Sequence, residues 1–279
     1  MTGGPPPRPA LREVIARHEL DARKSLGQHF LLDPGLCARI AGLAGDLAGR
    51  EVVEVGPGPG GLTRALLDAG PRRVVAVEVD PRAVAAAQEL RAEDPARLEV
   101  LTGDATRLDL ATLVATPRQV VANLPYNVGT PILVNLLRGA PAWERLTLMF
   151  QQEVADRICA APDTDAYGRL SVLAQWTCTA SVQLRVPPGA FSPPPRVWSA
   201  VVVLEPHPVQ PSPALFAAME RLTASAFGQR RKMLRGALRT LGHPGGPEAL
   251  LGAAGIAPER RAETLDVAEF ATLAGLVAG

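Results

Sequence analysis

Cysteine, histidine, lysine and long apolar runs are all scarce in this sequence of 279 residues. Its three cysteines lack CxxC spacing, so we expect neither a disulfide framework nor a metal site, and we interpret all three as small core residues. No apolar run approaches the roughly 18–20 residues that span a bilayer, which argues against a membrane protein. The first ten residues, MTGGPPPRPA, lack the layout of a signal peptide and predict a disordered lead-in to a cytoplasmic protein.

Lysine occurs only twice, whereas the chain has 29 basic residues in all, so arginine carries nearly all of the positive charge. The net charge of +1 is unevenly distributed, because six basic residues and no acidic one lie between Arg221 and Pro247. A basic block on a nearly neutral chain predicts contacts with a phosphate backbone. The alternative, a solvated helix face in an arginine-rich protein, is equally supported by charge alone.

Short β-branched runs alternate with helical patterns from residue 51 onward. The predicted strands are 51–55, 73–79, 97–101, 119–122 and 145–150, and the predicted helices between them are 60–69, 81–91, 110–115 and 130–138. This alternation predicts an α/β fold with a parallel, doubly wound sheet that is covered on both faces.

The pattern changes after two further predicted helices, near 151–160 and 169–177. Two strands, 179–186 and 198–205, are joined only by a proline-rich loop that is too short for a helical crossover, so we expect them to pair antiparallel. The proline-rich segment 205–213 is interpreted as a linker, and the remainder as several helices without a strand. The predicted organisation is a partly disordered N-terminal extension (1–23), an α/β domain (24–206) and a helical domain (207–279), and the family resemblance described below implies that the α/β domain is Rossmann-like.

A glycine-rich turn follows the first predicted strand of the sheet, in VVEVGPGPGGLTRALL (52–67). Gly56, Gly58 and Gly61 satisfy the GxGxxG pattern, in which glycines allow a tight turn and a close approach of a ligand to backbone amides at a helix N-terminus. Glu78 ends the next strand, where a carboxylate can accept both hydroxyls of a ribose. These features fit an NAD enzyme and an S-adenosylmethionine-dependent methyltransferase equally well.

Two further strand ends distinguish these ligands. Asp104, in LTGDATRLDL (101–110), can accept the amino group of a cofactor adenine. The four histidines lie outside every strand end of the predicted sheet, which argues against hydride transfer.

The tetrapeptide NLPY (123–126) at the fourth strand end suits methylation of an exocyclic amine. The Asn123 side-chain oxygen and a main-chain carbonyl, of Leu124 or Pro125, can accept the two N6 hydrogens of adenine, with the turn held rigid by proline. Tyr126 can stack on the base, a contact worth roughly 1–3 kcal/mol. Taken alone, a turn-forming Asn123 and a core aromatic Tyr126 are respectable alternatives, but after Gly56, Glu78 and Asp104 in that order we favour the functional interpretation.

A base taken out of its stack needs a second aromatic wall, and Phe191 in the loop VPPGAFSPPPRVWS (186–199) is our candidate. The alternative for Phe191, a loop aromatic that caps the core, is nearly as well supported.

The motifs together resemble the KsgA-type small-subunit ribosomal RNA adenine dimethyltransferases. The resemblance runs from about Lys24 to the final helix, in the segments KSLGQHFLLDP (24–34), VEVGPGPGGLT (53–63), VAVEVD (75–80), GDA (103–105), NLPYN (123–127), QQEVADRI (151–158), YGRLSV (167–172), FSPPPRVWSAV (191–201), FGQRRKMLRGAL (227–238) and GIAPERRAETLDVAEF (255–270).

The resemblance implies transfer of two methyl groups to N6 of each of two adjacent adenosines, in a hairpin near the 3′ end of 16S rRNA in the immature small ribosomal subunit. It also implies S-adenosyl-L-methionine as the cofactor, a role in subunit biogenesis and a monomeric protein. The cofactor contacts that it implies are His29, Leu31, Gly56, Gly58, Glu78, Asp104, Ala105 and Asn123, and the RNA contacts are Arg230, Arg231, Lys232 and Arg235. His29 is a departure, since family members often carry Asn there.

Two other functions are alternatives to the one that the resemblance implies. An erythromycin-resistance (Erm) methyltransferase shares the fold but modifies large-subunit RNA, and its motif usually reads NIPY rather than NLPY. A ribosome-assembly or transcription factor would keep the fold and act by binding alone, and the intact set of cofactor residues argues against that.

Overall fold

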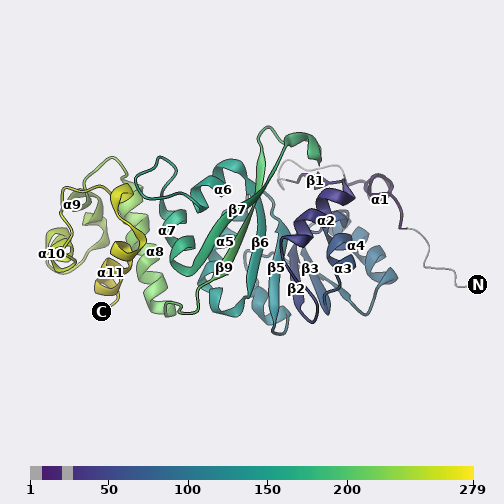
Figure 1. The fold of residues 1–279 in the computed structure, drawn as a ribbon, viewed down its shortest axis with the longest axis horizontal. Coiled ribbons are helices and arrows are strands. Elements are labelled where there is room, and N and C mark those ends of the chain that lie inside the picture. Colours follow the sequence, from purple (N-terminus) through teal and green to yellow (C-terminus); the bar gives the residue numbers. More distant parts are fainter. Residues whose placement is uncertain (1–7, 21–27) are drawn as a thin grey trace, which may run out of the picture. The chain divides into compact units, whose positions relative to one another are not determined.

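The computed structural model describes residues 8–20 and 28–279, and Figure 1 labels their helices and strands. In chain order the elements are α1 (Leu11–Arg17), β1 (Phe30–Leu31), α2 (Pro34–Gly42), β2 (Glu51–Val55), α3 (Gly61–Asp68), β3 (Arg73–Glu78), α4 (Pro81–Glu93), β4 (Leu98–Thr102), η2 (Leu110–Leu113), β5 (Arg118–Asn123), α5 (Gly129–Arg138), η3 (Ala140–Ala142), β6 (Arg145–Gln151), α6 (Gln152–Ile158), α7 (Arg169–Thr177), β7 (Cys178–Val186), η4 (Pro188–Ala190), β8 (Phe191–Ser192), β9 (Ser199–Pro206), α8 (Pro213–Gly228), α9 (Leu234–Ala237), η5 (Leu238–Leu241), α10 (Gly246–Ala253), η6 (Ala262–Thr264) and α11 (Val267–Ala278).

A seven-stranded sheet with the order β4-β3-β2-β5-β6-β9-β7 organises the fold. The five strands from β4 to β6 are parallel, and in their register Val53 of β2 lies between Val75 of β3 and Val120 of β5. All five residues of β2 are buried, as expected for a strand in the middle of a parallel sheet. The predicted α/β fold, with β7 and β9 as the neighbouring pair at one edge, is confirmed.

The strand order creates a crevice at one edge of this sheet. From β2 the chain proceeds outward to β3 and β4, then returns to the other side of β2 to form β5 and β6. Ligands of open α/β sheets bind outside the carboxyl ends of the strands at such a reversal of strand order. The glycine-rich turn after β2 and the tetrapeptide after β5 therefore lie at adjacent strand ends.

Several local predictions need correction. The segment predicted as a helix at 110–115 is a single 3₁₀ turn, Leu110–Leu113: Asp109 caps its start, and the chain is already extended at Val114. Of the three cysteines, Cys37 and Cys178 are buried, but Cys159 is only half-buried. The small antiparallel sheet of β1 and β8 was not predicted, because two-residue strands have no readable period.

The chain forms two compact units. The first contains residues up to Ile132 together with Ala142–Gln151 and Gln183–Val203, and the second contains Leu133–Pro141, Gln152–Val182 and Leu204–Gly279. The domain division at residues 206 and 207 remains a prediction. Residues 1–7, predicted as disordered, and the first residues of KSLGQHFLLDP, 24–27, lie outside the described residues.

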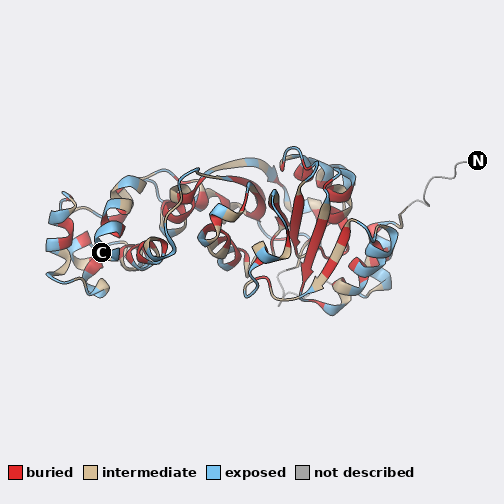
Figure 2. Ribbon diagram, turned by 90° about the horizontal axis from the view of Figure 1, so that it is seen from below, coloured by how far each residue is buried: buried red, intermediate tan, exposed pale blue. Residues whose placement is uncertain are grey.

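The core of the first unit is formed by the sheet and the helices packed on it. Its buried residues include Val52, Val74 and Val121 of the strands and Ile40 and Leu66 of α2 and α3. Figure 2 shows the central strands in red, as buried, and pale blue segments on the helices. Burial on both faces explains why the strands consist of continuous β-branched runs rather than of alternating residues.

The second unit is helical over its C-terminal part, where every described element from Pro213 onward is an α- or 3₁₀-helix. Aromatic contacts hold it together: Trp176 stacks on Phe216 with ring centroids 6.1 Å apart, and Phe227 stacks on Phe270 at 5.6 Å. Among the described helices of both units, none has the length and apolar character needed to cross a membrane.

Candidate active site

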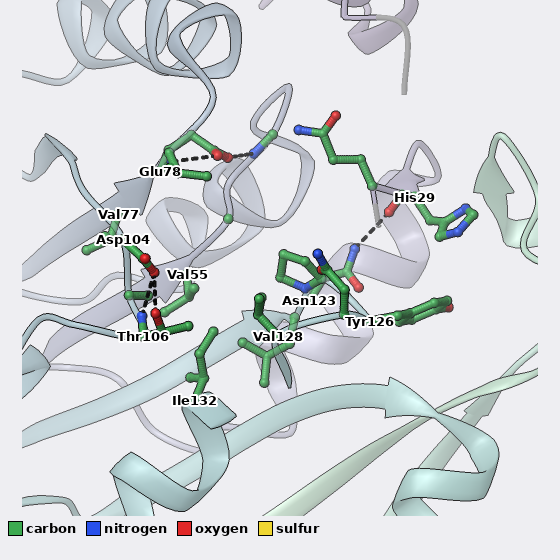
Figure 3. Close-up of a pocket in the computed structure, with 18 of the residues that line it drawn as sticks. His29, Val55, Val77, Glu78, Asp104, Thr106, Asn123, Tyr126, Val128 and Ile132 are labelled. Atoms are coloured by element: carbon green, nitrogen blue, oxygen red, sulfur yellow. Dashed lines mark hydrogen bonds between the residues drawn. The ribbon is translucent and has the colours of Figure 1, made fainter. Parts of the chain in front are cut away.

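A cavity of about 260 Å³ lies at the carboxyl ends of the central strands in the first unit (Figure 3). Ten of the twelve site residues predicted in this unit line it: His29, Gly56, Gly58, Glu78, Asp104, Ala105, Asn123, Leu124, Pro125 and Tyr126. The other two, Leu31 and Phe191, are buried beside it and pair with each other between β1 and β8. Segments that are far apart in the sequence therefore meet in one hollow.

The glycine-rich turn requires glycine for two reasons. Gly56 and Gly58 have φ angles of 71° and 54°, in the left-handed region that L side chains rarely adopt. At Gly58 an added Cβ would also lie 2.9 Å from two ring carbons of Phe30, which is closer than packed atoms tolerate. The turn therefore has no room for a side chain at Gly58, where Phe30 packs against the backbone.

Glu78, at the end of β3, is held by backbone amides. One carboxylate oxygen accepts from the N–H groups of Val79 and Asp80 at 2.8 and 2.9 Å, and the other accepts from Gly58 N–H at 3.4 Å. Burial raises the pKa of Glu78, and these three N–H groups oppose that rise. The carboxylate is fixed in position beside the glycine turn, where it can accept the hydroxyl groups of a ribose.

Asp104 follows β4 and is also oriented by its neighbours. Its Oδ1 accepts from the Thr106 hydroxyl at 2.6 Å and from the Thr106 N–H at 2.9 Å, and these bonds lower the pKa of Asp104. Figure 3 shows Asp104 and Thr106 on the same side of the cavity as Val77 and Val55. An ionised carboxylate can accept a hydrogen bond from the amino group of an adenine, and the apolar side chains beside it can pack on the flat faces of the ring.

Asn123 ends β5, and its amide has a defined orientation. Its Nδ2 donates to the main-chain carbonyl of His29 at 3.0 Å. Because a carbonyl oxygen only accepts hydrogen bonds, the amide nitrogen must face it, and Oδ1 is left as an acceptor. His29 thereby contributes through its backbone, a contact that the sequence did not predict.

The structure also distinguishes the two main-chain carbonyls that the sequence left open. The Pro125 carbonyl already accepts from the N–H groups of Val128 and Gly129, at 3.1 and 2.9 Å, as α5 begins. Among the described residues, no backbone N–H donates to the Leu124 carbonyl. Leu124 is therefore the better candidate for the second acceptor, and Pro125 serves to shape the turn.

Three aromatic rings cluster next to Asn123. The Tyr126 and His29 rings have centroids 5.1 Å apart, and the Phe191 ring meets His29 edge-on at 6.5 Å. The Tyr126 hydroxyl is hydrogen-bonded to the Ser199 hydroxyl at 2.5 Å, and His29 Nδ1 donates to the Pro193 carbonyl at 2.9 Å. Tyr126 is therefore fixed by the first residue of β9, and His29 by the loop that precedes this strand.

Sequence reasoning missed several residues of this site. Gln28 donates to Asp80 at 3.1 Å and thereby ties the segment before β1 to the start of α4. Ser199 orients Tyr126, and Glu54 lies buried beneath the glycine turn. Of these, only Glu54 had a readable signal, because a carboxylate in the middle of an apolar strand is unusual.

The predicted RNA contacts lie in the second unit. Arg231, Lys232 and Arg235 are exposed in and after the turn that follows α8, whereas Arg230 is half-buried and donates to the Thr164 carbonyl at 3.1 Å. Arg235 also lies 3.8 Å from Glu259. Three of the four cationic side chains are thus available at the surface of this unit.

The cavity residues fit S-adenosylmethionine. The glycine turn, Glu78 and Asp104 line one cavity at neighbouring strand ends, and the two carboxylates are hydrogen-bond acceptors of the kind that ribose hydroxyls and an adenine amino group require. The fold and site define a Rossmann-like methyltransferase that uses S-adenosylmethionine.

Comparison with known proteins identifies the family. Residues 19–278 match the model of the ribosomal RNA adenine dimethylase family, so the chain belongs to this family. The chain is 63% identical to Ribosomal RNA small subunit methyltransferase A of Gluconobacter oxydans over 280 aligned positions, which cover 98% of this chain and 91% of the relative. The protein of the same name from Paramagnetospirillum magneticum is 56% identical over 266 positions, with 95% and 94% covered.

Two solved structures share the fold. A dimethyladenosine transferase from Plasmodium falciparum is similar with a TM-score of 0.72 and 25% identity, over 88% of this chain and 96% of that one. The 23S rRNA methyltransferase ErmE is similar with a TM-score of 0.63 and 26% identity, over 89% and 99%.

Proposed function

We propose that this protein transfers methyl groups from S-adenosylmethionine to N6 of two adjacent adenosines in a hairpin near the 3′ end of 16S rRNA, giving dimethyladenosine. The observation that carries this proposal is the orientation of Asn123, whose side-chain oxygen is left as an acceptor beside an aromatic cluster. The names of the most similar relatives support the small subunit as the substrate.

The chain contributes two acceptors to the reaction. Bound S-adenosylmethionine supplies a methyl group that is already activated on a sulfonium. The lone pair of an adenine N6 is delocalised into the ring, and it becomes available when the two N6 hydrogens are held. Asn123 Oδ1 and the Leu124 carbonyl are the acceptors we assign to those hydrogens, both fixed before the base arrives.

The aromatic cluster holds the base. Tyr126 provides a stacking surface, and its hydroxyl bond to Ser199 prevents the ring from turning. Burial raises the pKa of Tyr126, so its hydroxyl stays protonated near neutral pH. Phe191 packs edge-on against His29, and His29 packs against Tyr126. The His29 ring therefore lies between Tyr126 and Phe191, the two rings predicted to enclose the base.

We assign RNA binding outside the cavity to the exposed cations of the second unit, Arg231, Lys232 and Arg235 with Arg230. They contact phosphates, because a cluster of guanidinium and ammonium groups neutralises the backbone of an RNA without reading its sequence. We also propose that residues 207–279 act as the RNA- and ribosome-binding domain, that the protein is a cytoplasmic monomer, and that it acts on the immature subunit during biogenesis.

The test is methyl transfer with labelled S-adenosylmethionine to under-methylated small subunits, mature small subunits and large subunits. We expect label in dimethyladenosine of under-methylated small-subunit RNA and none elsewhere. Label only in large-subunit RNA would overturn the small-subunit assignment.

Label only in large-subunit RNA is an outcome that a specific observation supports, namely the similarity to the structure of ErmE. It would identify an Erm-type enzyme, which is our second candidate. Binding to immature subunits without any transfer would instead identify an assembly factor that keeps the fold.

A further inference from the structure

Glu54 is a buried acid that the mechanism above does not use. Glu54 lies on β2, two residues before Gly56, and is only 1% exposed. Its Oε2 has no hydrogen-bond partner among the described residues, and none of the ion pairs among them includes Glu54. Leaving a buried polar atom without a partner costs about 1–3 kcal/mol, so its presence requires an explanation.

The carboxyl group of Glu54 lies directly behind the cofactor cavity. It lines a small cavity of about 20 Å³, which has room for about one water molecule, between the glycine turn and Asn123. Phe30, Gly56 and Asn123 line both this small cavity and the large one. Only the thin glycine turn and these shared residues separate Glu54 from the methyl-donor site.

The groups packed around Glu54 favour its neutral form. They are Cys37 of α2, Thr63 of α3, Glu78 of β3 and Asn123 of β5, and none of them is cationic. Burial raises the pKa of Glu54 to about 8, the Thr63 hydroxyl opposes the rise, and the charge of Glu78 adds to it. At neutral pH the free protein therefore holds a proton on Glu54 while Glu78 is stabilised by its three N–H donors.

A cation in the large cavity reverses this preference, because a nearby positive charge favours the ionised form of a carboxyl group. S-adenosylmethionine carries a positive sulfonium, and its demethylated product S-adenosylhomocysteine does not. We propose that Glu54 is a proton-linked counter-ion of the cofactor: it is neutral in the free protein and ionises when S-adenosylmethionine binds. The carboxyl O–H bond breaks, its electron pair stays on oxygen, and the proton goes to the buffer.

This inference rests on S-adenosylmethionine as the cofactor and does not depend on which RNA is methylated. Under this proposal the protonation state of Glu54 depends on whether the cofactor still carries its methyl group. When the sulfonium charge is lost on transfer, the carboxyl group regains its proton, and the product is held less tightly than the donor.

The test is isothermal titration calorimetry of the full-length protein with S-adenosylmethionine at pH 7, in phosphate and in Tris, whose ionisation enthalpies differ. The dependence of the binding enthalpy on the buffer gives the number of protons released. We expect the wild type to release close to one proton more than Glu54→Gln, since glutamine cannot ionise. The affinity of the wild type should also rise by up to tenfold per pH unit between pH 7 and 8 relative to that of Glu54→Gln.

Glu99→Gln is the matched control, because Glu99 is a partly exposed carboxylate on β4 in the same sheet. It should release as many protons as the wild type. Equal proton release by the wild type and Glu54→Gln would overturn the proposal.

If Glu54→Gln does not fold, a comparison of the two compounds on the wild type still tests the proposal. S-adenosylhomocysteine must then release fewer protons than S-adenosylmethionine, and equal numbers would refute the inference. A protein that binds neither compound would refute the cofactor assignment instead, so the two failures are distinguishable.

Discussion

The two ends of strand β2 each carry a buried glutamate, and the surroundings of the two shift their pKa values in opposite directions. Glu51, at the amino end, accepts from Arg73 at 3.0 Å and from the Ala115 N–H at 2.7 Å, and Arg72 lies at 2.9 Å. Burial alone would raise the pKa of Glu51, but these partners together lower it. Glu54, at the carboxyl end, lacks such partners among the described residues, and its pKa is raised to about 8.

The difference separates an acid whose oxygens are satisfied within the protein from one that keeps an unsatisfied oxygen. At the amino end every oxygen of the carboxylate is satisfied within the protein, so nothing remains for a ligand. At the carboxyl end Glu54 Oε2 and the Thr63 hydroxyl have no hydrogen-bond partner among the described residues, and the Asn123 side-chain oxygen is left as an acceptor. Unsatisfied polar groups with shifted pKa values are typical of functional sites.

The largest expected effect concerns the carboxyl end of the sheet and activity. Asn123→Ala removes the acceptor for one N6 hydrogen, and we expect the rate of methyl transfer to fall about 10²- to 10³-fold, as for loss of one preorganised hydrogen-bonding group. The bond to the His29 carbonyl is lost as well, so stability should fall by only about 1 kcal/mol. Single-turnover assays and thermal melts measure the two effects. A variant with a normal rate would remove Asn123 from the mechanism.

The next effect concerns the amino end of the same strand and stability. Glu51→Gln leaves Arg72 and Arg73 without their shared carboxylate, and since both arginines are partly exposed we expect a loss of about 2–3 kcal/mol rather than the larger value for a wholly buried pair. Activity per folded molecule should not change. Urea unfolding gives the free energy, and a stable but inactive variant would contradict the division between the two ends.

Glu54→Gln should have an effect of opposite sign that depends on pH. The folded pKa, about 8, lies above the ordinary value of 4.5, so between these values the folded state binds more protons than the unfolded state and stability falls as pH rises. Removing the acid should therefore raise stability at pH 8, by up to about 4 kcal/mol for a pKa raised from 4.5 to about 8, and change it little at pH 4. Unfolding curves at both pH values test this, and equal changes at both would show that Glu54 does not titrate.

The smallest effect concerns the second unit. Replacing Arg230 and Arg231 by Ala should weaken RNA binding a few-fold and reduce the slope of log affinity against log salt by about 1–2. Arg91→Ala, an exposed arginine on α4 of the first unit, is the control and should leave the slope unchanged. An unchanged slope in the double variant would return these arginines to the interpretation as a solvated face.

Sequence patterns predicted the strands of the sheet well because each is a β-branched run bounded by turn residues. The predicted bounds 51–55 agree with β2, and 73–79 and 145–150 differ from β3 and β6 by one residue. Predictions failed where the local signal was short, as for the 3₁₀ turn at Leu110–Leu113 and for β1 and β8. In such segments the conformation is decided by partners far away in the chain.

The candidate site shows the same division. Glycines and acids at strand ends carry a local signal, and Gly56, Gly58, Glu78 and Asp104 line one cavity. The choice of the Leu124 carbonyl over that of Pro125 depended on α5 beginning where it does and using the latter. The place of His29 depended on a loop more than 160 residues away, which supplies Pro193 and Phe191.

By itself the sequence determined the class of fold and the methyl donor, and it predicted NLPY as the acceptor tetrapeptide, because hydrophobic period, turn chemistry and residue type are local properties. Only the tertiary structure decided which atom of Asn123 faces the His29 carbonyl, which rings lie next to it, and that Glu54 Oε2 has no hydrogen-bond partner among the described residues while Glu51 has three partners. Hydrogen-bond satisfaction and burial are properties of the surroundings, and residues distant in the chain create those surroundings when it folds.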